Sequence, residues 1–199
     1  MRWDQLIQAL VDLNDGETIE NDTTIVTSAN IALAHLARYI PPKGHITIEK
    51  TADVEDIPGK VSTTFCPGYI QYMLGGMAQD FVSIIGAPHT PAGEDVSSLI
   101  IVDNYVLLPA KYAGTVIIDY RRRPENVTLD TVAYNGEIDV QPNCEDLLAL
   151  IMAYYVWLED EPTKAERFLQ MFMAQVSAEL SARSRAYTHE RVKNINGWR

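Results

Sequence analysis

The side chains that most often bind metals or act as nucleophiles are widely spaced in this 199-residue chain. The histidines are His35, His45, His89 and His189, and the two cysteines are Cys66 and Cys144. A zinc site needs ligands at close spacing, such as paired cysteines or two histidines on one helical face. The sequence therefore predicts no metal and no cofactor, and two reduced cysteines of the kind found in proteins made in the cytosol.

The short motifs that mark common catalytic sites do not occur in this sequence. There is no G-x-S-x-G, no Walker A motif and no G-x-G-x-x-G. Glu159-Asp160-Glu161 could supply paired carboxylates, but acids at a helix boundary usually face solvent and stabilise the helix amino terminus. We therefore expect a protein without enzymatic activity. An enzyme whose site is assembled from scattered residues, such as a carboxylate hydrolase, stays open as an alternative.

The most concentrated charge is the run Arg121, Arg122 and Arg123, which follows an alternating segment and precedes Pro124. The ordinary interpretation is a solvated strand end whose arginines pair with some of the many acids. The functional interpretation is a contact between subunits, because the planar guanidinium suits carboxylate pairing. Three arginines are too few to form a nucleic-acid face on a chain of net charge −11.

The carboxyl-terminal residues 187–199 differ in character from the rest of the acidic chain. From residue 183 onward, five basic residues accompany one acid, Glu190, and aromatic side chains are interleaved. A frayed end is the ordinary interpretation. Because Trp and Tyr are enriched at binding sites, we expect instead a docking tail that is disordered in the free subunit and becomes ordered on a partner. Its candidate docking residues are Tyr187, Arg191, Lys193, Ile195, Trp198 and Arg199.

Composition disfavours several classes of partner. An acidic chain disfavours nonspecific binding to DNA phosphates or to an anionic membrane, since both need a basic face. The longest apolar run, residues 147–158, is too short to span a bilayer. The first residues lack the apolar core of a signal peptide, so we expect no secretion.

Hydrophobic periodicity divides the chain into helical ends and a β-rich middle. Helical spacing predicts a helix over residues 3–13 and a second helix that is capped by Asn21 or Asp22 and stopped by Pro41-Pro42. It also predicts an apolar helix over 143–159 capped by Asn143, and a last helix from Pro162 that fades beyond Ala186. Strands are predicted over residues 45–49, 81–85, 99–102, 105–108, 115–120 and 127–132, with turns at Asp103-Asn104 and Asn135-Gly136. Residues 87–98 are expected to form a long surface loop.

This order predicts an α+β fold. Residues 1–43 and 140–186 are expected to form one helical bundle, and residues 44–139 an inserted antiparallel β-rich domain, followed by the tail 187–199. The terminal helical regions should pack together, because each offers more apolar surface than a hairpin alone can bury.

A strand ending in Tyr-Arg-x-x-Pro, an acidic-capped apolar helix and an Ala-Glu-Arg-x-Leu helix follow one another in residues 115–186. The matching residues are Tyr120, Arg121, Pro124, Leu147, Leu148, Ala153, Tyr154, Ala165, Glu166 and Leu169. In this the chain resembles the head–tail connector (adaptor) proteins of tailed bacteriophages.

The resemblance implies a structural protein of the virion neck, synthesised in the host cytoplasm. Such adaptors form a homo-oligomeric ring, usually a dodecamer, under the portal protein. They extend the DNA channel, bind the next neck or tail protein, and in several cases dock on the portal through a carboxyl-terminal extension. The alternatives are a tail-completion or stopper protein of the same neck, the enzyme named above, or a bacterial protein-binding module. Genomic DNA would pass through the ring without specific binding, because a lumen lined by carboxylates repels phosphates.

Overall fold

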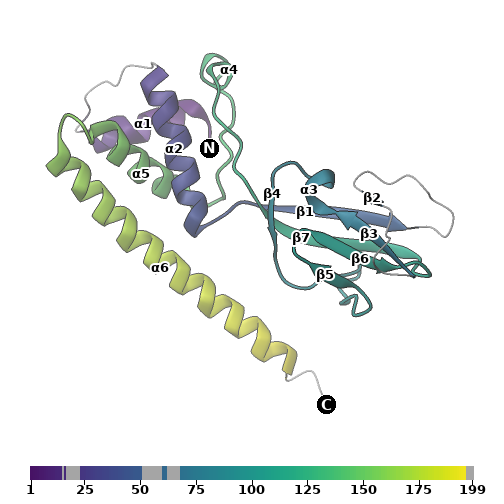
Figure 1. The fold of residues 1–199 in the computed structure, drawn as a ribbon. Coiled ribbons are helices and arrows are strands. Elements are labelled where there is room, and N and C mark those ends of the chain that lie inside the picture. Colours follow the sequence, from purple (N-terminus) through teal and green to yellow (C-terminus); the bar gives the residue numbers. More distant parts are fainter. Residues whose placement is uncertain (15, 17–22, 51–59, 62–67, 196–199) are drawn as a thin grey trace. The chain divides into compact units, whose positions relative to one another are not determined.

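A computed structural model describes residues 1–14, 16, 23–50, 60–61 and 68–195, with the backbone alone for residues 60–61 and 185–195. The chain forms two compact units (Figure 1). One comprises Met1–Ile40 and Glu125–Arg199, and the other comprises Pro41–Pro124. The predicted α+β class is confirmed: the terminal helices form one bundle, and an antiparallel β-rich part is inserted between them in the sequence.

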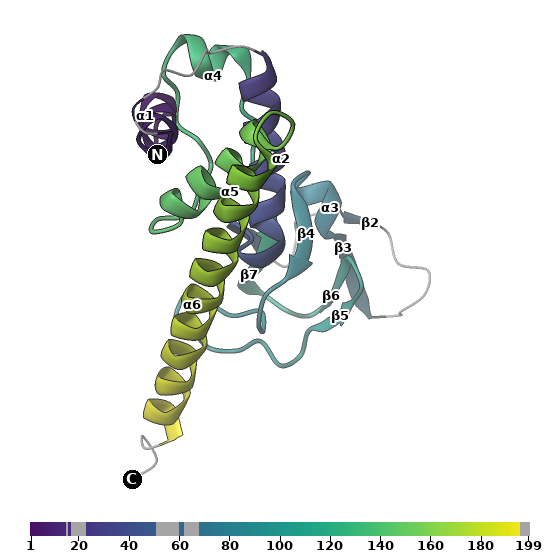
Figure 2. The ribbon, with the colours of Figure 1, turned by 90° about the vertical axis from the view of Figure 1, so that its left-hand side faces the viewer.

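The helical unit is organised around α5. Its elements are α1 (Trp3–Leu13), α2 (Thr23–Tyr39), α4 (Leu129–Ala133), α5 (Glu145–Trp157) and α6 (Pro162–Ile195). Helix α5 packs against α1, α2 and α6, so the predicted contact between the two terminal helical regions is confirmed. Figure 2 shows α6 continuing well past the other helices of this unit.

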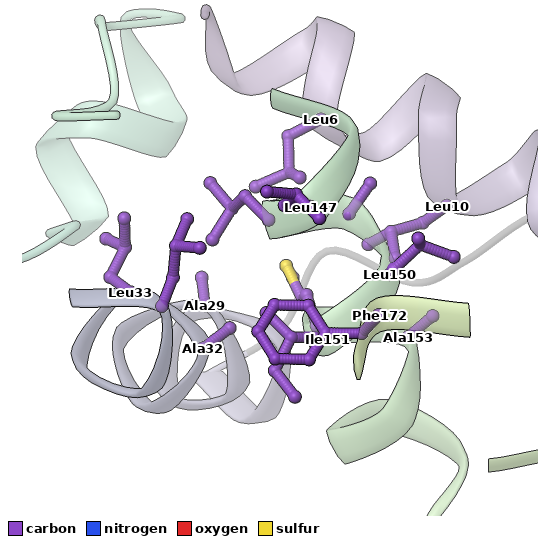
Figure 3. Close-up of a cluster of buried hydrophobic side chains, with 14 of the residues drawn as sticks. Leu6, Leu10, Ala29, Ala32, Leu33, Leu147, Leu150, Ile151, Ala153 and Phe172 are labelled. Carbon is purple, nitrogen blue, oxygen red and sulfur yellow. The ribbon is translucent and has the colours of Figure 1, made fainter. Parts of the chain in front are cut away.

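The core of the helical unit explains why α5 is apolar on nearly all sides. Leu148, Ile151 and Met152 have no exposed surface, because neighbouring helices surround them. Figure 3 shows Ile151 packed with Ala32 of α2 and Phe172 of α6. Full burial of each large side chain contributes about 1.5–3 kcal/mol, so a polar substitution in α5 should unfold this unit.

The second unit contains two small antiparallel sheets. Its elements are β1 (Lys43–Lys50), β2 (Lys60–Val61), β3 (Tyr69–Met73), α3 (Leu74–Met77), β4 (Phe81–Ile84), β5 (Ile100–Val102), β6 (Tyr105–Pro109) and β7 (Gly114–Arg122). The strand orders are β1-β7-β4 and β2-β3-β6-β5. Alternate residues of β1 and β7, such as Ile48 and Ile118, enter a core that also holds Tyr72 and Val106 of the other sheet. One core therefore holds both sheets together.

The hairpin turn at Asp103-Asn104 is confirmed. Strands β5 and β6 pair antiparallel with Val102 opposite Tyr105, which leaves two residues in the turn. Asp103 has φ 51°, a left-handed conformation that Asp adopts more readily than most residues.

The predicted strand over residues 127–132 is wrong, because this segment contains helix α4. The Thr128 side chain accepts a hydrogen bond from the amide of Thr131, which caps the helix. Asn135 has φ 49° and the Gly136 amide donates to the carbonyl of Thr131, so the expected turn ends a helix. Residues 125–139 consequently belong to the helical unit, and the β-rich unit ends at Pro124 and not at residue 139.

Helix boundaries at α5 and α6 also differ from the sequence prediction. Cys144, and not Asn143, is the N-cap of α5, since Asn143 has φ 66° and lies one residue earlier. Helix α6 runs to Ile195, so the backbone of residues 187–195 is helical where a disordered tail was expected. The physical reason is composition: this stretch holds Glu190, Arg191 and Lys193, and no glycine or proline interrupts the chain before Gly197.

Candidate protein-docking surfaces

The described part of the chain does not gather metal-binding side chains at one place. Within the described residues, no group of three or more His, Cys, Asp or Glu side chains could hold a metal ion. Cys144 is buried in the helical core, whereas Cys66 lies outside the described residues. Among the described helices, none has the length and apolar character needed to cross a bilayer.

One histidine does make a close polar contact. The Nδ1 atom of His35 lies 2.6 Å from the hydroxyl of Tyr155, and the imidazole stacks on Tyr39 and meets the edge of Phe172. Burial, and then the positive charge of Arg38, lower the pKa of His35, while burial raises the pKa of Tyr155. Both groups are therefore held neutral, and their contact ties α2 to α5 within an aromatic cluster.

Arg183 fixes α6 to the amino-terminal end of α5. Its guanidinium donates to Glu179 at 2.8 Å, to Gln141 at 2.9 Å and to the sulfur of Cys144 at 3.4 Å. Burial raises the pKa of the Cys144 thiol, and the positive charge of Arg183 opposes that shift. Arg183, which the sequence groups with the basic tail, therefore belongs to the bundle.

The three consecutive arginines lie at the end of β7, in the second unit. Arg122 donates from Nε to the carbonyl of Lys43 at 3.3 Å, which ties it to β1. Arg121 and Arg123 are exposed, and neither forms an ion pair within the described part of the chain. The structure thus brings two exposed guanidinium groups to one strand end, as a contact with carboxylates of another molecule requires.

Strand β5 presents the most apolar exposed row in the second unit. Among the described residues it is the outer strand of its sheet, and no other described strand pairs with its outer edge. Ile100, Ile101 and Val102 are 42%, 42% and 49% exposed. Soluble proteins usually protect such an edge with charges, proline or a covering segment, so an apolar open edge marks a contact site.

A groove in the helical unit lies where α1, α5 and α6 meet. Its volume is about 350 Å³, and its lining includes Asp12, Leu13, Asp146, Leu150, Met171 and Gln175. Leu150 of α5 is buried in the floor, while Met171 of α6 is 47% exposed. Asp12 and Asp146 are exposed, so the groove combines an apolar floor with two carboxylates.

Charge is divided unevenly within the helical unit. Residues 1–40 and 125–184 contain seventeen Asp and Glu against five Lys and Arg, whereas residues 185–199 contain four Lys and Arg against one Glu. The backbone of 185–195 continues α6, so helix α6 begins in the acidic body and continues into the basic segment. The six candidate docking residues lie in this segment, for which the structure describes only the helical backbone to Ile195.

Sequence reasoning identified the arginine run and the basic segment, but neither the β5 edge nor the groove. The apolar run 99–102 indicated a strand, and only the sheet order shows that it is outermost. The groove draws on three helices far apart in the sequence. In comparisons with known proteins, no family model matches this chain, and a search of curated proteins finds no match.

Proposed function

We propose that this protein is a structural virion protein of a tailed bacteriophage, a head–tail adaptor that forms a ring under the portal. The ring extends the DNA channel and binds the next neck or tail protein. The observation that carries the proposal is the apolar open edge at Ile100–Val102, because it suits a protein that works in contact with other subunits.

The energetics of this edge favour assembly. Full burial of one Ile or Val side chain contributes about 1.5–3 kcal/mol. Each of the three side chains still exposes nearly half of its surface. A subunit that covers the row therefore gains roughly 2–4 kcal/mol from these side chains alone. In a closed ring the same contact repeats at every interface, so a modest pairwise gain supports a stable assembly.

Charge supports the remaining parts of the proposal. The acidic helical unit suits a channel through which DNA slides, since carboxylates repel phosphates and hold no strand in place. Arg121 and Arg123 suit the contact between neighbouring subunits, where they would meet carboxylates on the next copy. This combination gives the protein both an assembly surface and a surface that does not retain DNA.

The test uses the full-length chain, sized by sedimentation alone and after mixing with portal rings from the same phage genome. Ile101→Glu places a charge on the β5 edge, and Ile31→Glu makes the same change at a similarly exposed position, 44%, on α2. The wild type and Ile31→Glu should add several copies to each portal, and Ile101→Glu should add none. Unchanged assembly of Ile101→Glu contradicts the proposal. Addition of a single wild-type copy indicates a stopper or tail-completion protein instead.

A further inference from the structure

The groove between α1, α5 and α6 has the chemistry of a receptor for a basic and aromatic segment. Its apolar floor, formed in part by Leu150 and Met171, can accept a large side chain. Its two carboxylates, on Asp12 and Asp146, favour cations beside that side chain. A methionine that lines a groove adapts its shape to different side chains.

The chain itself contains a segment of the complementary chemistry. Residues 185–199 hold three arginines, Lys193 and a single acid, together with Tyr187, Ile195 and Trp198. This composition is opposite to that of the acidic body that forms the groove. Trp198 lies near the end of the segment next to Arg199, so an apolar anchor and a cation are adjacent.

We infer that the groove of one copy binds the carboxyl-terminal segment, residues 185–199, of a neighbouring copy. Trp198 occupies the apolar floor, and the basic residues of the segment face Asp12 and Asp146. The inference rests on the homo-oligomer of the proposed function, and it adds a subunit contact that the β5 edge does not provide. In this inference the segment binds another subunit of the ring, whereas the sequence resemblance implies that it binds the portal.

Chain geometry requires that the segment come from another copy. Arg183 fixes α6 to the bundle, and the helix continues from there to Ile195. Gln175 lines the groove, and an α-helix rises about 1.5 Å per residue, so Ile195 lies roughly 30 Å further along the helix axis. The three residues from Ile195 to Trp198 can span only about 11 Å. Trp198 therefore cannot return to the groove of its own chain.

The experiment is photo-crosslinking in the full-length chain with benzoylphenylalanine in place of Trp198. Unlabelled photoreactive copies are mixed with ¹⁵N-labelled copies at the concentration at which the ring forms, and cross-linked peptides are identified by mass spectrometry. We expect links to the peptides of α1, α5 and α6 that line the groove, with the two isotopes on opposite sides of the link. The yield should fall as salt is raised, because the contacts at the rim are ionic.

A charge reversal supplies the matched control. Asp12→Lys should lower the yield of groove links by roughly fivefold. The substitution removes one exposed ion pair and places a lysine opposite the basic residues of the segment. Asp130→Lys makes the same change at an exposed acid of α4 outside the groove and should leave the yield unchanged. Met171→Ser tests the apolar floor without altering charge and should also lower the yield.

The outcomes separate this inference from the proposed function. Links confined to one isotope, links only to the second unit, or links to portal peptides in place of groove peptides overturn the inference, even where rings form. Groove links between isotopes in a sample that forms no ring support the inference and count against the adaptor ring. Equal yields for Asp12→Lys and Asp130→Lys also overturn it.

Discussion

Gly44 of β1 lies directly under the ring of Tyr120, its partner on β7. A Cβ atom at Gly44 would stand 2.5 Å from Cζ, 2.7 Å from Oη and 2.8 Å from Cε1 of Tyr120. The tyrosine cannot move away easily, because it is 6% exposed, packs on Phe81 and donates to Asp80 at 2.9 Å. Gly44→Ala should therefore displace the ring and weaken that hydrogen bond.

The expected cost follows from these contacts. Overpacking of a filled core costs about 1–3 kcal/mol, and a lost hydrogen bond costs about 0.5–1.5 kcal/mol. Replacing glycine by alanine returns about 0.4–1 kcal/mol by restricting the unfolded chain. The net destabilisation of the second unit should be about 1–3 kcal/mol.

Hydrogen exchange of peptides from β1 and β7 measures this cost locally. Their protection should fall by roughly 5- to 150-fold, while peptides of α5 stay unchanged because α5 belongs to the other core. In a Tyr120→Leu background, Gly44→Ala should cost almost nothing, since leucine lacks the three clashing atoms. An equal cost in both backgrounds, or no cost in either, refutes this reasoning.

Three further predictions concern the helical core, its histidine and the expected absence of metal and catalysis. Leu148→Asp puts an unpaired carboxylate at a site with no exposed surface and should cost about 3–5 kcal/mol, read from the urea midpoint of tryptophan fluorescence. The lowered pKa of His35 means that the unfolded chain binds more protons below the ordinary value of 6.5. Stability should therefore be full above that value and decline as the pH falls toward the lower folded pKa, and His35→Gln should flatten this decline. Chelator treatment should leave the melting temperature unchanged, and a hydrolase screen should give no turnover that a single point mutation abolishes.

The sequence is most informative where one local signal decides the structure. The helix of residues 3–13 has the bounds predicted from its apolar spacing, because exposed polar residues separate its buried ones: Asp4, Gln5 and Gln8 lie between Trp3, Leu6 and Leu10. The all-apolar character of residues 147–158 correctly predicted a helix covered on most sides. The strands β4 to β7 also lie where alternation and turn residues placed them, within one or two residues at each end.

The errors arise where local signals compete. Val127, Thr128 and Val132 favour a strand by composition, yet the cap at Thr128 makes a short helix possible and the burial of Val127 fixes it to the bundle. Residues 187–195 lack an apolar stripe, yet the backbone of α6 continues through them, and no glycine or proline interrupts the chain before Gly197. Apolar spacing predicts packed helices well, whereas a helical extension without an apolar stripe gives no such signal.

The candidate surfaces could not be predicted from local patterns, for a different reason. Ile100–Val102 has the composition of a buried strand, and its exposure depends on the position of β5 in the sheet order. The groove depends on how α1, α5 and α6 pack, although its acidic residues and the basic segment are both visible in the sequence. Tertiary structure turns these separate features into surfaces that another subunit can recognise.

The adaptor proposal is tested most directly by electron cryomicroscopy of the intact neck of the phage particle. It predicts several copies of this chain arranged as a ring around the DNA channel, directly under the portal, with acidic side chains toward the channel. A single copy per neck, or a peripheral position away from the channel, would contradict it.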